Sequence, residues 1–276
     1  MAMEYNSCTA ACGFVLLLVF NQSYLGNAAD QGQGLGASFI FGDSLVDAGN
    51  NNYLPTLSKA NMVPNGIDLK ASGGKPTGRF TNGRTIGDIV GEELGQPNYA
   101  LPYLSPNATG KALLRLYQLD ARKFVIGSVG PIGCIPYQKT INQLNPDQCV
   151  ELPNKLALQY NGRLKGLLAE LNKNLPGSTF VYANVYDLVM DVITNYEKYG
   201  FTTASVACCG NGGQYAGIIP CGPQSSLCED RLMHVFWDPY HPSDAANLII
   251  AKKLLDGDTK IIYPMNLRQL RDHGLG

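Results

Sequence analysis

A serine near the start of the chain has the residue type and the setting of a catalytic nucleophile. Ser44 follows the apolar run Ala37–Phe41 and a glycine turn at Gly42. A serine after a strand lies at the carboxyl edge of a sheet, where the N-terminus of a following helix can offer backbone N–H groups to developing negative charge. Taken alone, this signal is weak, because Asp43 or Ser44 is at least as typical of a helix N-cap.

A histidine and an aspartate near the other end of the chain could activate that serine. A serine hydroxyl is a poor nucleophile until an imidazole takes its proton, and the imidazole needs an acceptor that fixes its tautomer. Asp238 and His241 lie three residues apart in a loop bounded by prolines, and they could supply both groups. His234 precedes an apolar pair and is more typical of a structural residue, and His273 lies in the C-terminal tail. A structural role also stays open for His241.

The elements that must position these residues alternate between strands and helices. The predicted strands are Ala37–Phe41, 123–126 and Thr179–Ala183, and the predicted helices are 85–94, 152–171 and 243–256. Ser243 is a suitable N-cap for the last helix, and Gly257 a suitable stop. This alternation predicts an α/β protein with a parallel sheet and ligands at the carboxyl ends of its strands. From 42 to 121 no other strand is evident, and so long a loop indicates missing elements or a function.

The N-terminal segment has the pattern of a secretory signal peptide. Seven apolar residues at 14–20 precede a polar stretch and the small residues Gly26, Ala28 and Ala29. We therefore predict that residues 1–29 are removed and that 30–276 form a single domain; a buried helix is the alternative. The apolar run is too short to cross a bilayer, and no other stretch approaches the required length, so we expect a secreted protein without stable membrane insertion.

The cysteines are predicted to form disulfides. The six beyond the signal segment are Cys134, Cys149, Cys208, Cys209, Cys221 and Cys228. An even number in an exported chain favours disulfides, and six allow 15 connectivities. Cys134 and Cys149 share their own local segment, so we favour that pair, with the other four pairing among themselves. A zinc site in the second group is disfavoured, because the group contains no C-x-x-C pair and no histidine.

Charge and surface features narrow the class of protein further. The chain has 21 Lys and Arg against 22 Asp and Glu, and only 16% of its residues are charged. This balance excludes an electrostatic nucleic-acid binder. Asn107 opens an Asn-Ala-Thr sequon in a loop and is a candidate glycosylation site, although an unmodified surface loop is the alternative.

Five blocks of sequence resemble the plant GDSL esterase/lipase family of the SGNH hydrolase superfamily. They are FIFGDSLVDAGNNNYL at 39–54, KPTGRFTNGRTIGDIVGEELG at 75–95, ARKFVIGSVGPIGCIP at 121–136, CCGNGG at 208–213 and FWDPYHPSDAAN at 236–247. The resemblance implies a flavodoxin-like three-layer α/β/α fold and a triad of Ser44, Asp238 and His241. It implies hydrolysis of carboxylic esters through an acyl-enzyme, with Ser44 as nucleophile, His241 as base and then acid, and Asp238 as its orienter.

The resemblance also implies where such a protein acts and on what. Its location would be the cell wall or apoplast, and its substrates small esters, acyl lipids or acylated polysaccharides, with a role in lipid catabolism. No metal or organic cofactor is indicated, because the triad mechanism needs neither.

The sequence departs from the family between the serine and the middle strand. Family members have a block with an oxyanion-hole glycine and a G-x-N-D block whose asparagine completes that hole, and neither has a counterpart here. We therefore predict an internal deletion joined near 113–116, an incomplete parallel sheet, and the backbone N–H of Ser44 as the remaining oxyanion donor. Each lost donor typically costs about 2.7 to 4 kcal/mol of transition-state stabilisation. A catalytically inactive truncated isoform and a non-catalytic exported binding protein are the alternatives to an active esterase.

Overall fold

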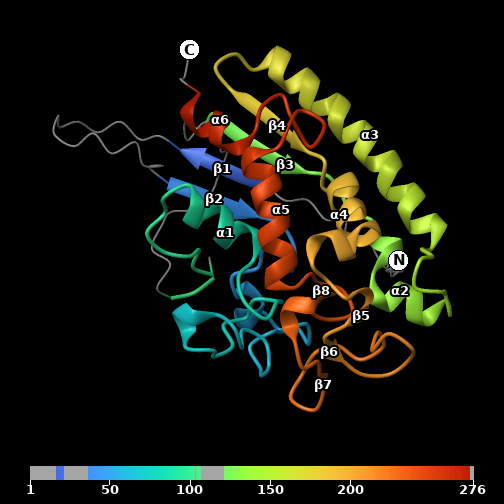
Figure 1. Ribbon diagram of the computed structural model, residues 1–276. Helices are drawn as coiled ribbons and strands as arrows, with labels where there is room; N and C mark the ends of the chain where they lie inside the picture. Colours follow the sequence, from blue (N-terminus) through green and yellow to red (C-terminus); the bar gives the residue numbers. More distant parts are fainter. Residues whose placement is uncertain (1–16, 22–36, 103, 107–120, 274–276) are drawn as a thin grey trace, which may run out of the picture.

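A five-stranded sheet forms the centre of the computed structural model, which describes residues 17–21, 37–102, 104–106 and 121–273 (Figure 1). Its order is β2-β1-β3-β4-β9. The strands are β1 (Leu17–Asn21), β2 (Ala37–Phe41), β3 (Lys123–Gly127), β4 (Thr179–Ala183) and β9 (Ile262–Tyr263). Two smaller pairs are β5 (Thr203–Ala207) with β8 (His234–Phe236), and β6 (Cys209–Gly210) with β7 (Ser226–Leu227). Asn107 and the predicted join at 113–116 lie outside the described residues.

Strands β2, β3 and β4 point in the same direction. β3 and β4 are parallel, with Lys123 opposite Thr179. β1 runs antiparallel to both β2 and β3, so these two strands share a direction, while β9 runs antiparallel to β4. The carboxyl ends of the three strands expected from the sequence therefore meet at one edge of the sheet, although the sheet as a whole is mixed.

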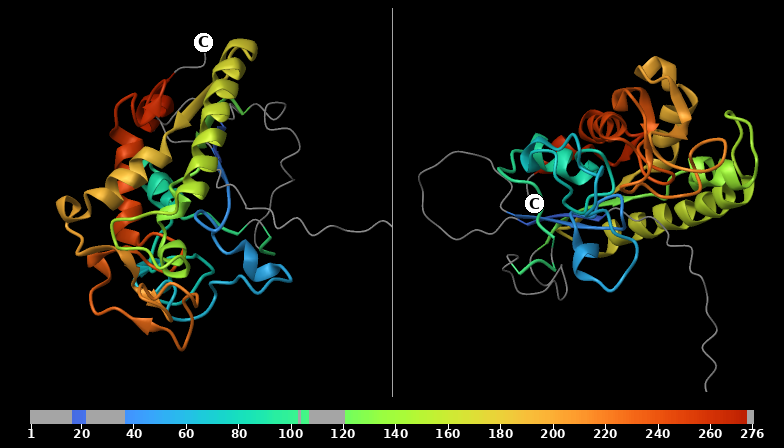
Figure 2. Two further views of the ribbon diagram at one scale, coloured as in Figure 1. Left: turned by 90° about the vertical axis from the view of Figure 1, so that its right-hand side faces the viewer. Right: turned by 90° about the horizontal axis from the view of Figure 1, so that it is seen from below.

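Helices cover both faces of the sheet, which gives the three layers expected of this α/β fold (Figure 2). They are α1 (Ile86–Glu93), α2 (Pro136–Ile141), α3 (Glu151–Asn174), α4 (Val185–Thr194), α5 (Asp244–Asp256) and α6 (Leu267–Asp272). Alternation along the strands divides the core. Val125 and Val181 pack in one cluster with α1, α5 and α6, whereas Phe124 and Phe180 stack on each other in a second cluster with Leu168 of α3.

The three predicted helices are present as α1, α3 and α5, whereas α2, α4 and α6 of the described part of the chain were not predicted. α5 begins directly after Ser243, whose hydroxyl accepts the Ala246 N–H at 3.2 Å, and Thr85 caps α1. α4 escaped prediction because its apolar residues include several β-branched ones, which are more typical of strands. Asn184 sets the helix instead, since its side chain caps the N-terminus by accepting the N–H of Asp187.

Strand β1 lies inside the segment predicted to be a removed signal peptide. Leu17 lies opposite Phe41 of β2 and opposite Ile126 of β3. Removal of residues 1–29 would therefore take away the strand that lies between β2 and β3. Cleavage of this segment stays a prediction.

Three disulfides fasten the loops at the carboxyl edge of the sheet. Cys134 is bonded to Cys149, the pair that the spacing favours, and the remaining bonds join Cys208 to Cys228 and Cys209 to Cys221. His234 lies near the sulfurs of Cys208 and Cys228, but their mutual bond leaves neither thiolate free for a metal. Among the described residues, no helix is long and apolar enough to cross a membrane.

Candidate active site

Ser44, His241 and Asp238 form a continuous relay, although 197 residues separate the serine from the histidine. The Ser44 Oγ lies 2.7 Å from His241 Nε2. On the other side of the ring, His241 Nδ1 lies 2.8 Å from each carboxylate oxygen of Asp238. The histidine and the aspartate are buried, with 7% and 3% of their surfaces exposed. This is the arrangement that serine hydrolases use to activate a hydroxyl.

A tight turn fixes the histidine and the aspartate relative to each other. Asp238 Oδ1 accepts the backbone N–H groups of Tyr240 and His241, both at 2.8 Å, in addition to the imidazole. The Trp237 N–H donates to the His241 carbonyl at 2.8 Å, which closes the turn. The indole of Trp237 is fully buried and donates to Asn65 Oδ1 at 3.0 Å. Both oxygens of the Asp238 carboxylate therefore have hydrogen-bond partners.

Ser44 lies in the turn that directly follows β2. The carboxylate of Asp43 accepts the Leu45 N–H at 2.9 Å, and the Asp43 carbonyl accepts the Val46 N–H at 3.2 Å. A few residues later the Asp47 carboxylate accepts three successive backbone N–H groups, from residues 49, 50 and 51. Side-chain oxygens thus hold a loop that contains little regular structure.

Asp43 has an environment unlike that of Asp238. Its Oδ2 is buried and has no hydrogen-bond partner among the described residues. Burial raises the pKa of Asp43 above its ordinary value, although the Leu45 N–H and His241 act in the opposite direction. The carboxyl next to the nucleophile is therefore easier to protonate than an exposed aspartate.

Arg79 and Phe80 connect the serine loop to the histidine. The Arg79 guanidinium makes a bidentate ion pair with Asp88 of α1, at 2.7 and 2.8 Å, and donates to the Ala48 carbonyl at 3.3 Å. The next residue, Phe80, places its ring 5.0 Å from the His241 ring, centroid to centroid. Sequence reasoning from residue types missed both positions, because their signal is a contact in space with segments far away in the chain.

The same segment also anchors the start of α5, directly after the histidine loop. Arg84 makes an ion pair with Asp244 at 3.0 Å, and Asp244 accepts the Arg84 backbone N–H. The Asp244 carboxylate raises the pKa of Arg84. A Cβ on Gly83 would lie 2.5 Å from the Asp244 carboxylate, so only glycine fits beside this pair. Residues 79–84, which we name the strap, therefore contact both sides of the candidate site.

The backbone N–H of Ser44 is the predicted oxyanion donor, and this role stays a prediction. Within the described part of the chain, the backbone N–H of Ser44 has no hydrogen-bond acceptor. The asparagine and glycine blocks that would supply further donors are absent from the sequence. Ser44, His241 and Asp238 thus form an unbroken series of contacts, while a reduced means of stabilising an oxyanion stays a prediction.

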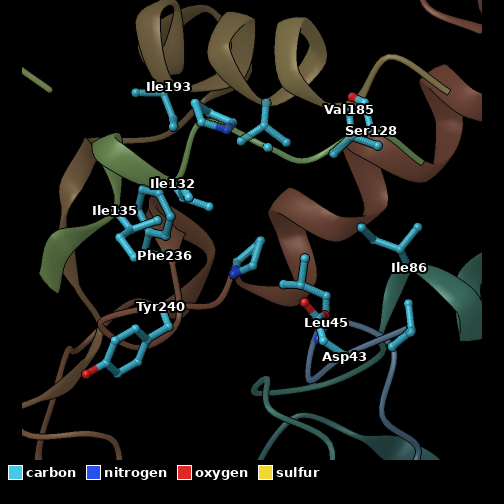
Figure 3. Close-up of a pocket in the computed structure, with 15 residues that line it drawn as sticks. Asp43, Leu45, Ile86, Ser128, Ile132, Ile135, Val185, Ile193, Phe236 and Tyr240 are labelled. Carbon is cyan, nitrogen blue, oxygen red and sulfur yellow. The ribbon is translucent and has the colours of Figure 1, made fainter. Parts of the chain in front are cut away.

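A pocket opens beside the triad and encloses about 720 Å³, counting the solvent at its mouth (Figure 3). Its walls come from the serine loop, the histidine loop, α4 and the loop after β3. The lining residues are Asp43, Leu45, Val46, Ile86, Ser128, Gly130, Pro131, Ile132, Ile135, Val185, Val189, Ile193, Phe236, Tyr240 and Pro242. It lies at the carboxyl edge of the sheet, where α/β proteins bind ligands.

An α/β fold in which a serine contacts a histidine, and that histidine contacts an aspartate, is typical of serine hydrolases. A sequence profile of the GDSL-like Lipase/Acylhydrolase family matches residues 100–254. GDSL esterase/lipase At2g23540 of Arabidopsis thaliana is 55% identical over 349 aligned positions, which cover 89% of this chain and 90% of the relative. GDSL esterase/lipase At3g50400 of the same plant is 48% identical, covering 94% and 97%. The chain belongs to the GDSL-like lipase and acylhydrolase family, and through that family it is a carboxylic ester hydrolase.

The alignment with At2g23540 has more positions than this chain has residues to fill them. Since 89% of 276 residues is about 246, about 100 of the 349 aligned positions have no residue from this chain. A span of about 246 residues includes Ser44, Asp238 and His241 wherever it begins. That the missing positions fall near 113–116 stays a prediction.

Proposed function

We propose that this protein is a secreted serine esterase that cleaves carboxylic esters through an acyl-enzyme, with a role in lipid catabolism. The observation that carries the proposal is the 2.7 Å contact between Ser44 Oγ and His241 Nε2, with Asp238 on the far side of the ring. These groups come from two segments that are far apart in the sequence, yet they lie at hydrogen-bonding distance. A purely structural histidine does not require a serine hydroxyl at its Nε2. Export to the cell wall or apoplast is supported by the signal-like segment 1–29.

In the proposed reaction, Ser44 Oγ attacks the ester carbonyl carbon while His241 Nε2 takes the hydroxyl proton. The carbonyl oxygen becomes an oxyanion that the Ser44 backbone N–H faces. The intermediate collapses by breaking the bond to the alcohol oxygen, which receives the proton from His241. Water then attacks the acyl-enzyme and loses a proton to His241. The bond between the acyl carbon and Ser44 Oγ breaks, Ser44 Oγ receives that proton from His241, and the acid is released. Asp238 holds the tautomer and stabilises the imidazolium in both halves.

A non-catalytic exported binding protein is the second candidate, favoured by the missing oxyanion donors. The experiment that separates the two compares hydrolysis of p-nitrophenyl acetate by the wild-type chain, Ser44→Ala and Ser58→Ala. Ser58 is an exposed serine whose hydrogen bonds within the described residues go to Asn51 and Thr56 and not to the relay, and it serves as the matched control. We expect Ser44→Ala to fall to the uncatalysed rate and Ser58→Ala to match the wild type. Equal rates for all three proteins would favour the binding protein and overturn the esterase.

A further inference from the structure

The strap fixes the backbone on both sides of Phe80. Before it, the buried guanidinium of Arg79 makes the bidentate ion pair with α1. After it, the Thr81 carbonyl accepts the Gly66 N–H at 2.9 Å, and Thr81 is fully buried. The two anchors belong to different parts of the fold, so the half-buried side chain of Phe80 has a defined place against His241.

The Phe80 ring lies against the His241 ring. Their planes are tilted by 33°, which is closer to parallel than to perpendicular, and their centroids are 5.0 Å apart. Aromatic pairs at centroid separations of about 4.5 to 7 Å attract each other. In the part of the chain that the structure describes, Tyr240 is the other aromatic residue in contact with His241, and it approaches edge-on at 6.1 Å. Phe80 therefore makes the closer ring contact with the imidazole.

Two hydrogen bonds help to hold the imidazole of His241 before the reaction, and one of them is lost during it. Asp238 contacts Nδ1 and Ser44 Oγ contacts Nε2. Once Ser44 Oγ carries the acyl group, it has no proton to donate to Nε2. The ring must still present Nε2 to the attacking water at that stage. Of the three contacts, those with Asp238 and Phe80 then remain.

We propose that Phe80 is a positioning residue whose ring holds the His241 imidazole in place while water attacks the acyl-enzyme. The inference rests on the proposed function, because the acyl-enzyme is part of it. A shift of a reacting group by about 1 Å can cost about a hundredfold in rate. A ring held by Asp238 alone should therefore activate water poorly. Acylation should depend less on Phe80, because Ser44 still contacts Nε2 at that stage.

Steady-state kinetics with p-nitrophenyl acetate separate the two halves of the reaction. Its leaving group is good, so hydrolysis of the acyl-enzyme limits kcat, while kcat/KM reports acylation. In Phe80→Leu and Phe80→Met, which both lack a flat ring, we expect kcat and KM to fall together by about tenfold or more, with kcat/KM unchanged. A smaller fraction of folded protein would lower kcat and leave KM unchanged, so a merely structural role gives a different pattern.

Two further variants serve as rescue and control. Phe80→Tyr keeps the ring and should match the wild type in kcat and KM. Tyr137→Leu is the matched control, because Tyr137 is also a half-buried aromatic residue. Its ring lies 5.1 Å from the Tyr240 ring, and within the described residues no ring contact joins it to His241. This control should leave kcat and KM unchanged, and circular dichroism confirms that each variant is folded.

Proton NMR of Ser44→Ala tests the same contact without turnover, because this variant lacks the serine contact just as the acyl-enzyme does. The Nδ1–H of His241 that donates to Asp238 gives a strongly deshielded resonance when the bond protects it from exchange with water. Its absence in His241→Ala assigns it. We expect the resonance in Ser44→Ala and in Phe80→Leu, where one of the two other contacts remains, and its loss in the double variant Ser44→Ala/Phe80→Leu.

The outcomes separate this inference from the proposed function. A resonance that persists in the double variant overturns the positioning role, and so does a kcat/KM that falls as far as kcat in Phe80→Leu and Phe80→Met. If the wild-type chain hydrolyses no ester, the esterase is overturned. The role of Phe80 is then supported by loss of the resonance in the double variant and overturned by its persistence.

Discussion

Asp238 and His241 lie in a turn that is held by buried backbone hydrogen bonds and two disulfides. Ser44 instead follows β2, and the only strand that pairs with β2 in the described part of the chain is β1. The Cys209 N–H donates to the Trp237 carbonyl and the Cys208 N–H to the Phe236 carbonyl, so the histidine side is tied to the chain on both flanks. On the serine side, the contacts are mostly between side chains and loops. The histidine turn is thus tied by backbone hydrogen bonds to the disulfide-bonded segment at 208–209, and the strap contacts both sides, the serine loop through Arg79 and Ala48 and the histidine side through Phe80.

The two aspartates beside the reacting groups repeat this difference. Every oxygen of Asp238 has a hydrogen-bond partner, while Asp43 keeps a buried oxygen without one among the described residues. A native site rarely leaves a buried carboxylate oxygen unpaired. We therefore expect the absence of about 100 aligned positions relative to At2g23540 to affect the packing and hydrogen bonding of the serine side most.

Breaking the strap should have the largest effect on stability. In Asp88→Ala the Arg79 guanidinium would stay buried without its partner, since the two side chains are 6% and 1% exposed. Removing one partner of a buried pair typically costs about 3 to 5 kcal/mol. Urea unfolding followed by the fluorescence of Trp237, the single tryptophan, measures this cost.

Glu92→Ala is the matched control for the strap. Glu92 lies on the same helix and pairs with Arg84, but half of its side-chain surface is exposed. An exposed pair contributes about 1 kcal/mol or less. Equal losses of stability in the two variants would contradict the role given to the strap.

A proline in β1 should show whether this strand supports the nucleophile. Val19 lies opposite Phe39 of β2 and Phe124 of β3, so β1 is paired along both edges. Proline cannot donate to a ladder, and within regular structure it costs about 3 kcal/mol or more. In chain that retains residues 1–29, Val19→Pro should lower the free energy of unfolding by about that amount.

In chain that has been exported and cleaved, the same substitution should change nothing. The intact mass of the secreted protein tells which form is present. Unchanged unfolding of Val19→Pro in chain that retains the segment would contradict a supporting role for β1.

Removing a disulfide should weaken the histidine side by a comparable or smaller amount. The bond between Cys209 and Cys221 closes a loop with a sequence separation of 12 and lies against Trp237. Loops of this size are stabilised by about 3 kcal/mol. The double variant Cys209→Ala/Cys221→Ala should therefore unfold at a lower urea concentration. It should keep the hydrogen bonds from Tyr240 and His241 to the Asp238 carboxylate while it is folded. Loss of the proline-bounded turn, detected as loss of esterase activity at low temperature where the variant is folded, would contradict this separation.

Asp43→Asn should produce the smallest change, visible through its pH dependence. Burial raises the pKa of Asp43 above 3.8 in the folded chain. The folded state then binds the proton more tightly than the unfolded state, so this carboxyl favours folding most at low pH and less as pH rises through its raised pKa. Asparagine does not ionise. Relative to the wild type, the variant should gain stability between pH 4 and pH 7, and a difference that is constant over this range would contradict the shift.

The part of the fold that follows local rules was predictable from the sequence. β2, β3 and β4 are short and mostly apolar, and Ser243 and Thr85 are strong N-caps, so these elements were predicted close to their observed bounds. The strap contacts were not predictable, because Phe80 meets His241 across 161 positions with no periodic signal. β1 was not predictable either, since its apolar run is as typical of a signal segment as of a strand. Its pairing with β2 and β3 is a contact between distant segments that the sequence pattern does not indicate.

The proposal depends most on Ser44 meeting His241 in a chain that lacks about 100 aligned positions, and covalent labelling of the serine tests this directly. The folded protein is treated with diisopropyl fluorophosphate, digested, and its peptides are identified by mass spectrometry. We predict that the adduct forms on Ser44 in the wild-type chain and is lost in His241→Ala, because the hydroxyl then has no base. A folded wild-type chain that stays unlabelled at Ser44, or that is labelled equally in His241→Ala, would contradict the triad.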